Sequence, residues 1–546
     1  MLSYRKLAMR VLGRPLHTGG SDSPRPASQR AAALILTAAM LTTLTAPAFA
    51  KEWYIEEGDI TVRAGETEGT NKVSQGENPE VEDTNTVITN SDKDKASSNT
   101  VTIEAKDKDD KVEVTLKDVN IDTSSRSEAA VSVTGEGNTN IELDGDNALK
   151  SDIYSSGISS SGSLTISGGE NDSLTAQGGS GADGIYSSGS LTISGGTVTA
   201  NGGSGGGGDG GDGIWSSGGV TISGGSTVTA NGGDGKDDYG GDGIRSDSGD
   251  VTISGGSTVT ANGGNGGNVS GDGIRSDSGD VTISGGTVKA AGGDSKDGYG
   301  GDGIRSGGVT ISGGTVNAAG GNGGKVGGYG ICSFARVAIS GGTVNAAGGN
   351  GGKVGGDGIY SNDIDLSGSL ELTAKAGSPN GKALSQNGKE LNLDTIKDKL
   401  GPGAKVTTTD ADGKVNQVSA PRPVEPEEPV IPGESSSSSD GGSAAPSTPV
   451  SSLPGLTVTD KSGQRISYTS IRGNNVLSIR VGRFTASLRA SLAALRQLRA
   501  EGIDTITFQT ILCSTTLSVD ELLAMGGEDA EAVLTHRLTA SSLTVG

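Results

Sequence analysis

GDGIRSDSGDVTISGGSTVTANGG, residues 241–264, is one copy of a unit that recurs through the middle of the chain. The aspartate of its Asp-Gly-Ile element recurs at Asp183, Asp212, Asp242, Asp272, Asp302 and Asp357. Tyr329 begins a degenerate copy, and Asp152-Ile153-Tyr154 reads as a first copy, so that successive copies start 27 to 31 residues apart. A repeat of this length is typical of a solenoid, in which each unit packs only against its neighbours.

Apolar and polar residues alternate within each unit, which is the pattern of a strand with one buried face. Val251-Thr252-Ile253, Thr258-Val259-Thr260-Ala261 and Ile274-Arg275-Ser276 are three such runs, separated by glycine-rich corners. Three short strands and three corners predict one coil of a single-stranded parallel β-helix. Each buried isoleucine or valine contributes about 1.5–3 kcal/mol, so stability requires stacked coils. The glycine-rich tails are expected to form mobile loops, because glycine loses the most backbone entropy on ordering.

Composition excludes several classes of protein. The 546 residues include 96 glycines without a strict Gly-X-Y period, which excludes collagen. Aromatic residues make up 3%, too few for an ordinary globular core throughout. The formal net charge of −22 argues against nucleic acid or an anionic membrane as a partner. Cys332 and Cys513 have neither disulfide-framework nor metal-site spacing.

The ends of the chain differ from the repeats. A basic leader, an apolar run over residues 31–44 and Ala48-Phe49-Ala50 predict a secretory signal over residues 1–50. That run is short for a membrane span, and the mature chain is expected to have none, so the predicted location is extracellular or cell-surface. Residues 51–150 are predicted to form irregular first coils and a cap, and 151–420 the regular coils and a C-terminal cap. A Pro/Ser-rich linker follows at 421–454.

Residues 455–546 have a different pattern and predict a small α/β domain, to which the sequence assigns no function. Strands are expected over residues 466–471, 476–481, 505–508 and 533–536, and a short helix over 519–525. Leu488, Leu492, Leu495 and Leu498 are expected on one face of another helix. In the solenoid, Leu384, Leu391, Leu393 and Ile396 are expected to close its C-terminal end.

A family resemblance rests on the opening segment 53–62, the segment 99–103 and the Ile-Ser-Gly-Gly-Thr-Val-Thr-Ala coils. These resemble secreted clostridial carbohydrate-binding β-helix proteins, whose fold is similar to that of pectate lyases. The resemblance covers roughly residues 51–400. It implies a right-handed helix, calcium sites along it, and binding of cellulose-like or acidic plant polysaccharide.

The candidate binding residues follow the isoleucine of each Asp-Gly-Ile element. Because that isoleucine points inward, its successor points outward. We call this set the outward column: Tyr154, Tyr186, Trp215, Arg245, Arg275, Arg305, Cys332 and Tyr360. Its members are expected to lie about 4.8 Å apart. Rings can stack on sugar faces, and arginine can bind a uronate carboxylate. Alternatively, the arginines form an ordinary charged face with the neighbouring aspartates Asp242, Asp247, Asp272, Asp277 and Asp302.

A second set, the aspartate column, is the candidate metal site: Asp183, Asp212, Asp242, Asp272 and Asp302. Like charges at this spacing repel, so their repetition requires an explanation. Either the carboxylates accept backbone hydrogen bonds at the Asp-Gly corners, or they share calcium ions. Residues 178–185 fit the calcium nonapeptide pattern Gly-Gly-x-Gly-x-Asp-x-apolar, although only once per coil. Backbone bonding is the favoured interpretation.

A third set, the threonine column, comprises Thr192, Thr221, Thr252, Thr282 and Thr310. Flat threonine lattices let some β-helices bind ice, but exposed β-branched strand residues explain the pattern more simply. Catalysis has little support, since His536 is the one histidine of the predicted mature chain and no carboxylate pair stands out. The sequence therefore predicts a secreted, noncatalytic polysaccharide-binding protein. The alternatives are a calcium-dependent polysaccharide lyase, with an arginine as base, and a cell-surface adhesin or stalk.

Overall fold

The computed structural model describes residues 51–67 and 69–420, and 456–459, 465–466, 468–473, 476–481, 486–510, 514–519, 522–523, 531–536 and 541–545. The predicted signal segment and linker lie outside the described residues. Within that described part of the chain, no helix is long and apolar enough to cross a membrane.

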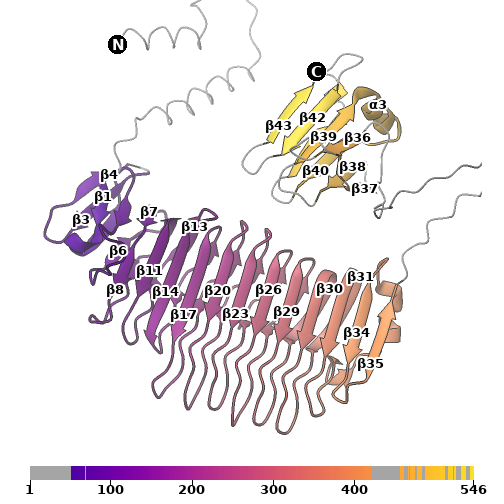
Figure 1. Cartoon of the computed structure of the whole chain (residues 1–546), viewed down its shortest axis with the longest axis horizontal. Coiled ribbons are helices and arrows are strands. Elements are labelled where there is room, and N and C mark those ends of the chain that lie inside the picture. The colour runs from indigo at the N-terminus through magenta and orange to yellow at the C-terminus, as the bar shows by residue number, and fades with distance from the viewer. Residues whose placement is uncertain are drawn as a thin grey trace, which may run out of the picture.

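The fold is a parallel β-helix, as predicted. Its coils stack side by side along one axis, and three ladders of parallel strands form its faces (Figure 1). Ladder 1 contains β2 (Ile60–Ala64), β6 (Val101–Glu104), β9 (Val131–Thr134), β12 (Ile158–Ser160), β15 (Ile185–Ser187), β18 (Ile214–Ser216), β21 (Ile244–Ser246), β24 (Ile274–Ser276), β27 (Ile304–Ser306) and β32 (Leu384–Gln386). Ladder 2 contains β1 (Glu52–Tyr54), β5 (Val87–Thr89), β7 (Lys111–Lys117), β10 (Asn138–Asp144), β13 (Ser163–Gly168), β16 (Leu191–Ile193), β19 (Val220–Ile222), β22 (Val251–Ile253), β25 (Val281–Ile283) and β28 (Val309–Ile311).

Ladder 3 contains β8 (Asn120–Asp122), β11 (Asp146–Lys150), β14 (Ser173–Ser180), β17 (Thr197–Gly203), β20 (Thr227–Asn231), β23 (Thr258–Asn262), β26 (Thr287–Ala291), β29 (Thr315–Ala319) and β34 (Lys405–Thr409). Two long strands, β30 (Ile331–Ala347) and β31 (Ile359–Lys375), continue the ladders in the last coils. The pairing joins equivalent residues of successive repeats, so the sequence period and the coil are the same unit.

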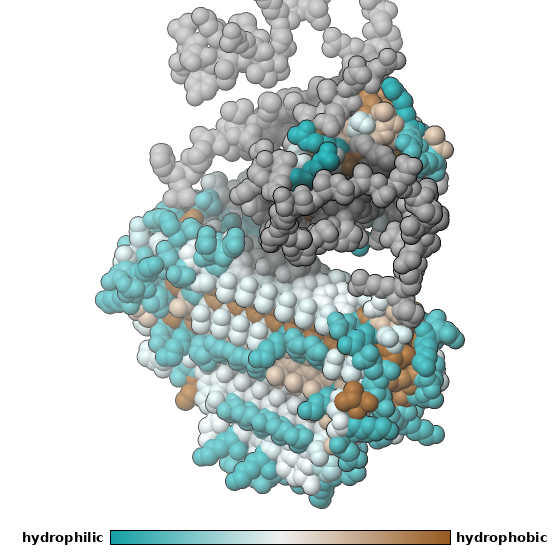
Figure 2. Space-filling view, turned by 45° about the vertical axis from the view of Figure 1, so that its right-hand side comes forward, coloured by the Kyte–Doolittle hydropathy of each residue, from teal (hydrophilic) through white to brown (hydrophobic). Residues whose placement is uncertain are grey.

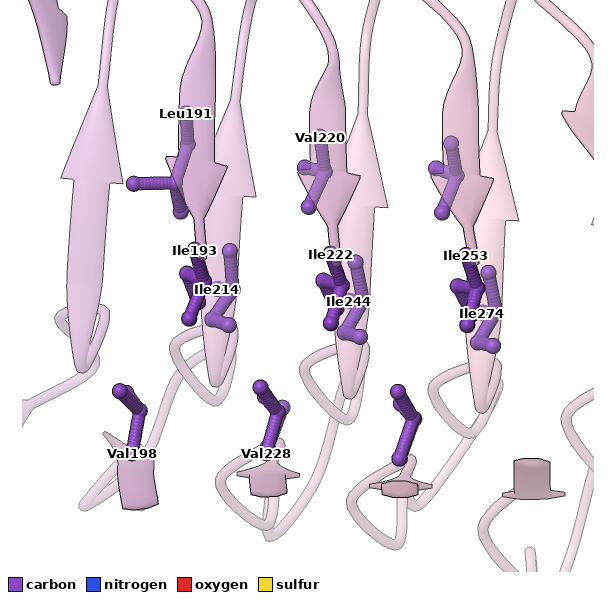
Figure 3. Packing of buried hydrophobic residues seen from close by; sticks show 14 of the residues in the cluster. Leu191, Ile193, Val198, Ile214, Val220, Ile222, Val228, Ile244, Ile253 and Ile274 are labelled. Carbon is purple, nitrogen blue, oxygen red and sulfur yellow. The ribbon is translucent and has the colours of Figure 1, made fainter. Parts of the chain in front are cut away.

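The core is built as the alternation predicts. In one coil Ile274, Val281, Ile283, Val288 and Ala290 all point inward and are fully buried. Each stacks on its equivalent in the next coil, and Figure 3 shows these columns of isoleucine, valine and leucine side chains. The corners are made possible by glycine, because a pair such as Gly255 and Gly256 adopts φ of 66° and 76°, which strains other residues. The predicted solenoid core is confirmed.

The expectation of mobile glycine-rich loops is wrong. The loops lie parallel to one another along one edge of the solenoid (Figure 1) and are joined by β-bridges at Gly205, Gly235, Gly266, Ser295, Gly323 and Gly351. The two arms of each loop also bond to each other and to the previous coil: Gly233 N donates to Gly211 O (2.8 Å), and Gly241 N donates to Gly233 O (2.9 Å). Glycine is present here because the backbones approach too closely for side chains, which the entropy argument did not consider.

Both ends of the solenoid are covered by irregular elements. At the N-terminus, η1 (Ile55–Glu57), β3 (Asn71–Gln75) and β4 (Val81–Asp83) form the cap, in which β3 pairs antiparallel with β2 and β4. At the C-terminus lie β33 (Lys389–Glu390), η2 (Leu393–Lys399) and β35 (Val415–Ser419). Leu384 and Ile396 are buried in the core there, and Leu391 and Leu393 pack against it, as predicted.

The C-terminal domain contains two four-stranded sheets. One comprises β36 (Leu456–Thr459), β39 (Ala486–Ser491), β42 (Glu531–His536) and β43 (Ser541–Val545). The other comprises β37 (Thr469–Gly473), β38 (Val476–Arg480), β40 (Thr505–Gln509) and β41 (Ser514–Ser518). Helix α3 (Leu492–Ala500) buries Leu492, Leu495 and Leu498 as predicted, but Leu488 belongs to β39, because the helix starts at the Ser491 cap. Most of the helix expected over 519–525 lies outside the described residues.

Candidate functional site

The outward column forms a continuous row on ladder 1 from Tyr186 to Tyr360. The strand pairing sets the residues in the order Tyr186, Trp215, Arg245, Arg275, Arg305, Cys332 and Tyr360. Six steps of one coil make the row about 29 Å long, at about 4.8 Å for each step. The predicted side-by-side arrangement of these seven residues is therefore confirmed.

Tyr154 does not belong to this row, contrary to the prediction. The strand that pairs with β15 is β12, so Ser159 is the neighbour of Tyr186. Tyr154 lies in the preceding turn with φ of 62°, and 85% of it is exposed. The first coil has an extra turn between its aspartate and its strand, and the resemblance of Asp152-Ile153-Tyr154 to the repeat concealed this. Tyr154 nevertheless lines the same open depression as Asp183 and Tyr186.

Cys332 is in register with the column but is buried, with 2% of its surface exposed. Next to it the Tyr329 and Tyr360 rings stack at 5.1 Å between centroids and 19° between planes. Tyr329 stands where the other repeats have aspartate, and burial raises its pKa to about 12. The sequence showed Tyr329 as a degenerate copy but gave no signal that its ring would stack on the column.

The aromatic end of the column contains unsatisfied polar atoms. The rings of Tyr186 and Trp215 meet edge to face at 5.1 Å, and the Arg245 guanidinium lies 5.2 Å from the Trp215 ring centroid. The buried atoms Trp215 Nε1, Arg245 Nε and Asp247 Oδ1 form no hydrogen bond. Arg245 Nε and Asp247 Oδ1 are 3.1 Å apart, but their angle is not that of a hydrogen bond. Trp215 Nε1 has neither a hydrogen bond nor an ion pair, and such an unpaired buried atom costs about 1–3 kcal/mol.

The arginines of the column are paired with aspartates. Asp277 accepts from Arg275 Nε (2.6 Å) and from a terminal nitrogen of Arg245 (3.1 Å). Arg275 also lies 3.8 Å from Asp242, and Arg305 lies 3.7 Å from Asp302. Between 31% and 41% of each arginine side chain is exposed. The charged-face alternative is thus present in the geometry, and a uronate that binds here has to compete with these aspartates.

The aspartate column is bonded to the backbone of the next coil. Asp183 Oδ1 accepts from Asp212 N at 2.7 Å, and Asp242 Oδ1 accepts from Asp272 N at 2.6 Å. The same bond recurs at Asp212, at Asp302 and, in the last coil, at Asp357. Burial raises the pKa of Asp183 to about 6, of Asp212 to about 7 and of Asp302 to about 8, and those of Asp242 and Asp272 also rise.

These hydrogen bonds leave few carboxylate oxygens able to coordinate a metal ion. Each carboxylate commits one oxygen to a backbone amide, whereas calcium takes six to eight oxygen ligands. Among the described residues, no group of three or more histidine, cysteine, aspartate or glutamate residues is arranged to hold a metal. Calcium binding by the aspartate column stays a prediction.

The threonine column lies on ladder 2. Thr192, Thr221, Thr252, Thr282 and Thr310 are in register, and Ala338 and Asp365 follow them. In the other direction the row continues through Thr165. In Figure 2 bands of hydrophilic and of intermediate residues run along the solenoid parallel to its axis, which is the surface expected from such rows.

Fold and site together define a parallel β-helix protein with aligned surface columns. A family model described as a beta helix repeat matches residues 220–244, 281–304 and 309–331. Each match runs from the first inward residue of a ladder 2 strand to the isoleucine of the next Asp-Gly-Ile element or, in the third match, of its degenerate copy at Tyr329. No curated protein and no solved structure matches the chain.

Proposed function

We propose that this protein is secreted and binds polysaccharide without catalysis, through the outward column. The observation that supports this most is the aromatic end, where Tyr186 and Trp215 form a pair beside buried polar atoms without hydrogen bonds. A sugar presents an apolar face to a ring and hydroxyl groups at its rim, so it can satisfy both. The rise of one coil is also close to the length that one sugar unit adds to an extended polysaccharide chain.

The charges along the outward column decide whether an acidic or a neutral polysaccharide suits each half of it. The arginines can bind uronates, as in an acidic plant polysaccharide, if the ligand displaces Asp277 or Asp242 from them. In the aromatic half, Asp183 lies beside Tyr186 in the depression, and a neutral sugar fits there better than an acidic one. We therefore assign stacking to the aromatic half and recognition of charge to the arginine half. Calcium would act by neutralising the aspartate column.

Replacing both Tyr186 and Trp215 with alanine is expected to leave the solenoid folded and to weaken retention on polysaccharide. Loss of one stacking contact at about 1.4 kcal/mol corresponds to about tenfold weaker binding. The measurement is a glycan array with and without calcium, followed by retention of wild type and variant on the insoluble form of the best glycan.

The matched control is Tyr239→Ala, which removes an exposed tyrosine from a glycine-rich loop away from the column. Its retention should equal that of wild type, and circular dichroism should show the same β-structure in all three proteins. Equal retention of the double variant would discard the outward column as the site. Binding to cells or host proteins but to no glycan would favour an adhesin, and release of unsaturated uronides from pectate would favour a lyase.

A further inference from the structure

The N-terminal cap creates a cleft that the repeats do not have. The cleft has a volume of about 280 Å³, just below the usual range for ligand sites, and lies over the first strands of ladder 2. Its floor is made by the outward residues of β7 and β10, and its wall by the segments around β3 and before β5. It is lined by Gly69, Asn71, Thr84, Asn85, Thr86, Lys111, Glu113, Val114, Thr115, Asn140 and Glu142.

The wall is attached firmly to the floor. The buried Asn71 donates from Nδ2 to Thr86 Oγ1 (2.9 Å) and to the backbone oxygen of Glu113 (2.7 Å). Thr115 N donates to Thr86 O at 2.9 Å. In the same cap, Trp53 Nε1 donates to Asp83 at 2.7 Å and holds the end of β4 in place. A cleft fixed in this way is organised before any ligand arrives, which lowers the entropic cost of binding.

The charged groups of the cleft are free, in contrast to those of the outward column. Lys111, Glu113 and Glu142 form no ion pair with any described residue, whereas Arg245, Arg275 and Arg305 each have an aspartate within 4 Å. Glu113 faces Asn140 across the ladder, and Thr115 faces Glu142. Two carboxylates, three asparagine side chains and three threonine hydroxyls thus surround one space, and their acceptors exceed the single lysine cation.

We propose that this cleft binds a neutral saccharide, with Glu113, Asn140 and Glu142 hydrogen-bonding its hydroxyl groups. The excess of carboxylates disfavours uronates and phosphates, and a lining in which nearly every side chain is polar or charged disfavours a wholly apolar ligand. A sugar provides many hydroxyl donors and fills a small polar cleft. This site lies on a different ladder from the outward column and does not depend on the function proposed for that column.

The threonine column extends this site. Glu113, Asn140, Thr165 and Thr192 are consecutive members of one outward row, so the row runs from the cleft onto the regular coils. A saccharide that has one unit in the cleft can continue along the threonine hydroxyls. This gives the threonine column a role as a track for hydrogen bonding, which its sequence pattern alone did not indicate.

The test is isothermal titration of the full chain with cellotetraose, xylotetraose, mannotetraose and tetragalacturonate. At least one neutral tetrasaccharide should bind, and the cleft variants should weaken its binding more than that of tetragalacturonate, which the arginines of the outward column can also bind. Glu142→Gln and Asn140→Ala should each weaken that binding about tenfold, whereas Tyr239→Ala, in a glycine-rich loop outside ladders 1 and 2, should change it less than twofold. Glu142→Gln should weaken tetrasaccharide binding by the same factor in the Tyr186 and Trp215 double variant as in wild type, which separates this site from the outward column.

Several outcomes would overturn the proposal. These are no binding of any neutral tetrasaccharide, cleft variants that weaken binding of tetragalacturonate more than binding of the neutral sugars, or equal binding of the neutral tetrasaccharide by wild type, Glu142→Gln and Asn140→Ala. Titration with calcium chloride alone is a further arm, and calcium binding that Glu142→Gln abolishes, without saccharide binding, would make the cleft a cation site instead. Circular dichroism of each variant shows that the solenoid is folded.

Discussion

Replacing Gly241 with alanine is expected to destabilise the solenoid by about 3 kcal/mol, the upper end of the usual range for overpacking, because the contacted atoms cannot move. A Cβ at this position would lie 2.0 Å from Gly211 O and 2.5 Å from its carbonyl carbon. Both are backbone atoms, held by the loop-to-loop hydrogen bonds, so no side chain can rotate to make room. Thermal unfolding followed by circular dichroism measures the loss, and amide exchange in the neighbouring loops locates it.

The matched control is Gly208→Ala, in the tip of the preceding glycine-rich loop. No atom lies within 4 Å of a Cβ there, and the backbone does not have the positive φ that favours glycine. This variant should be neutral or more stable by about 0.4–1 kcal/mol, because alanine reduces the entropy of the unfolded chain. Equal effects of the two substitutions would show that the loops do not stack on one another as described.

The stability of the solenoid is expected to increase as pH falls from 8 to 5. Burial raises the pKa of Asp183, Asp212 and Asp302 to about 6, 7 and 8, above the value of 3.8 for an unperturbed aspartate. In this range the folded chain therefore binds more protons than the unfolded chain, so stability falls as pH rises through these values. The midpoint of thermal unfolding, measured at half-unit steps of pH, reports this slope.

Asp212→Asn should reduce the dependence of the solenoid's stability on pH. The amide oxygen can still accept the hydrogen bond from Asp242 N, but no charge is buried. At pH 8 the variant should be more stable than wild type by about 2 kcal/mol, since each unit of pKa shift is worth about 1.4 kcal/mol and the amide must also find an acceptor. At pH 5, where the aspartate is already protonated, the two proteins should differ little.

Asp294→Asn is the control for this substitution. Asp294 Oδ1 accepts from Asn322 N at 2.6 Å in the same manner, but Asp294 is exposed and its neighbours in that row, Asn265 and Asn322, are already asparagine. The variant should match wild type at both pH values. If Asp212→Asn and Asp294→Asn behave alike, buried charge in the aspartate column does not govern the stability of the solenoid.

The features that were predicted correctly from the sequence are those that the alternation of apolar and polar residues sets. Ile274 and its equivalents point inward, so Trp215, Arg245 and Arg275 had to point outward and align once the coils stacked. The two predictions that failed depend on features that the alternation does not set. Tyr154 lies outside the column because its turn is longer than in later coils, and the loops are ordered because their backbones bond across coils.

The sequence by itself determined the coil, its core and the order of residues along each outward column. The two-residue alternation sets whether each side chain points inward or outward, and the thirty-residue repeat sets which residues of neighbouring coils pair. The tertiary structure alone decided which charges are paired and where a cleft exists. Asp277 accepts hydrogen bonds from two arginines because the stacking of neighbouring coils places both beside it. The cleft exists because Asn71 bonds to Thr86 and to the backbone of Glu113, a contact across 42 residues that no repeat encodes.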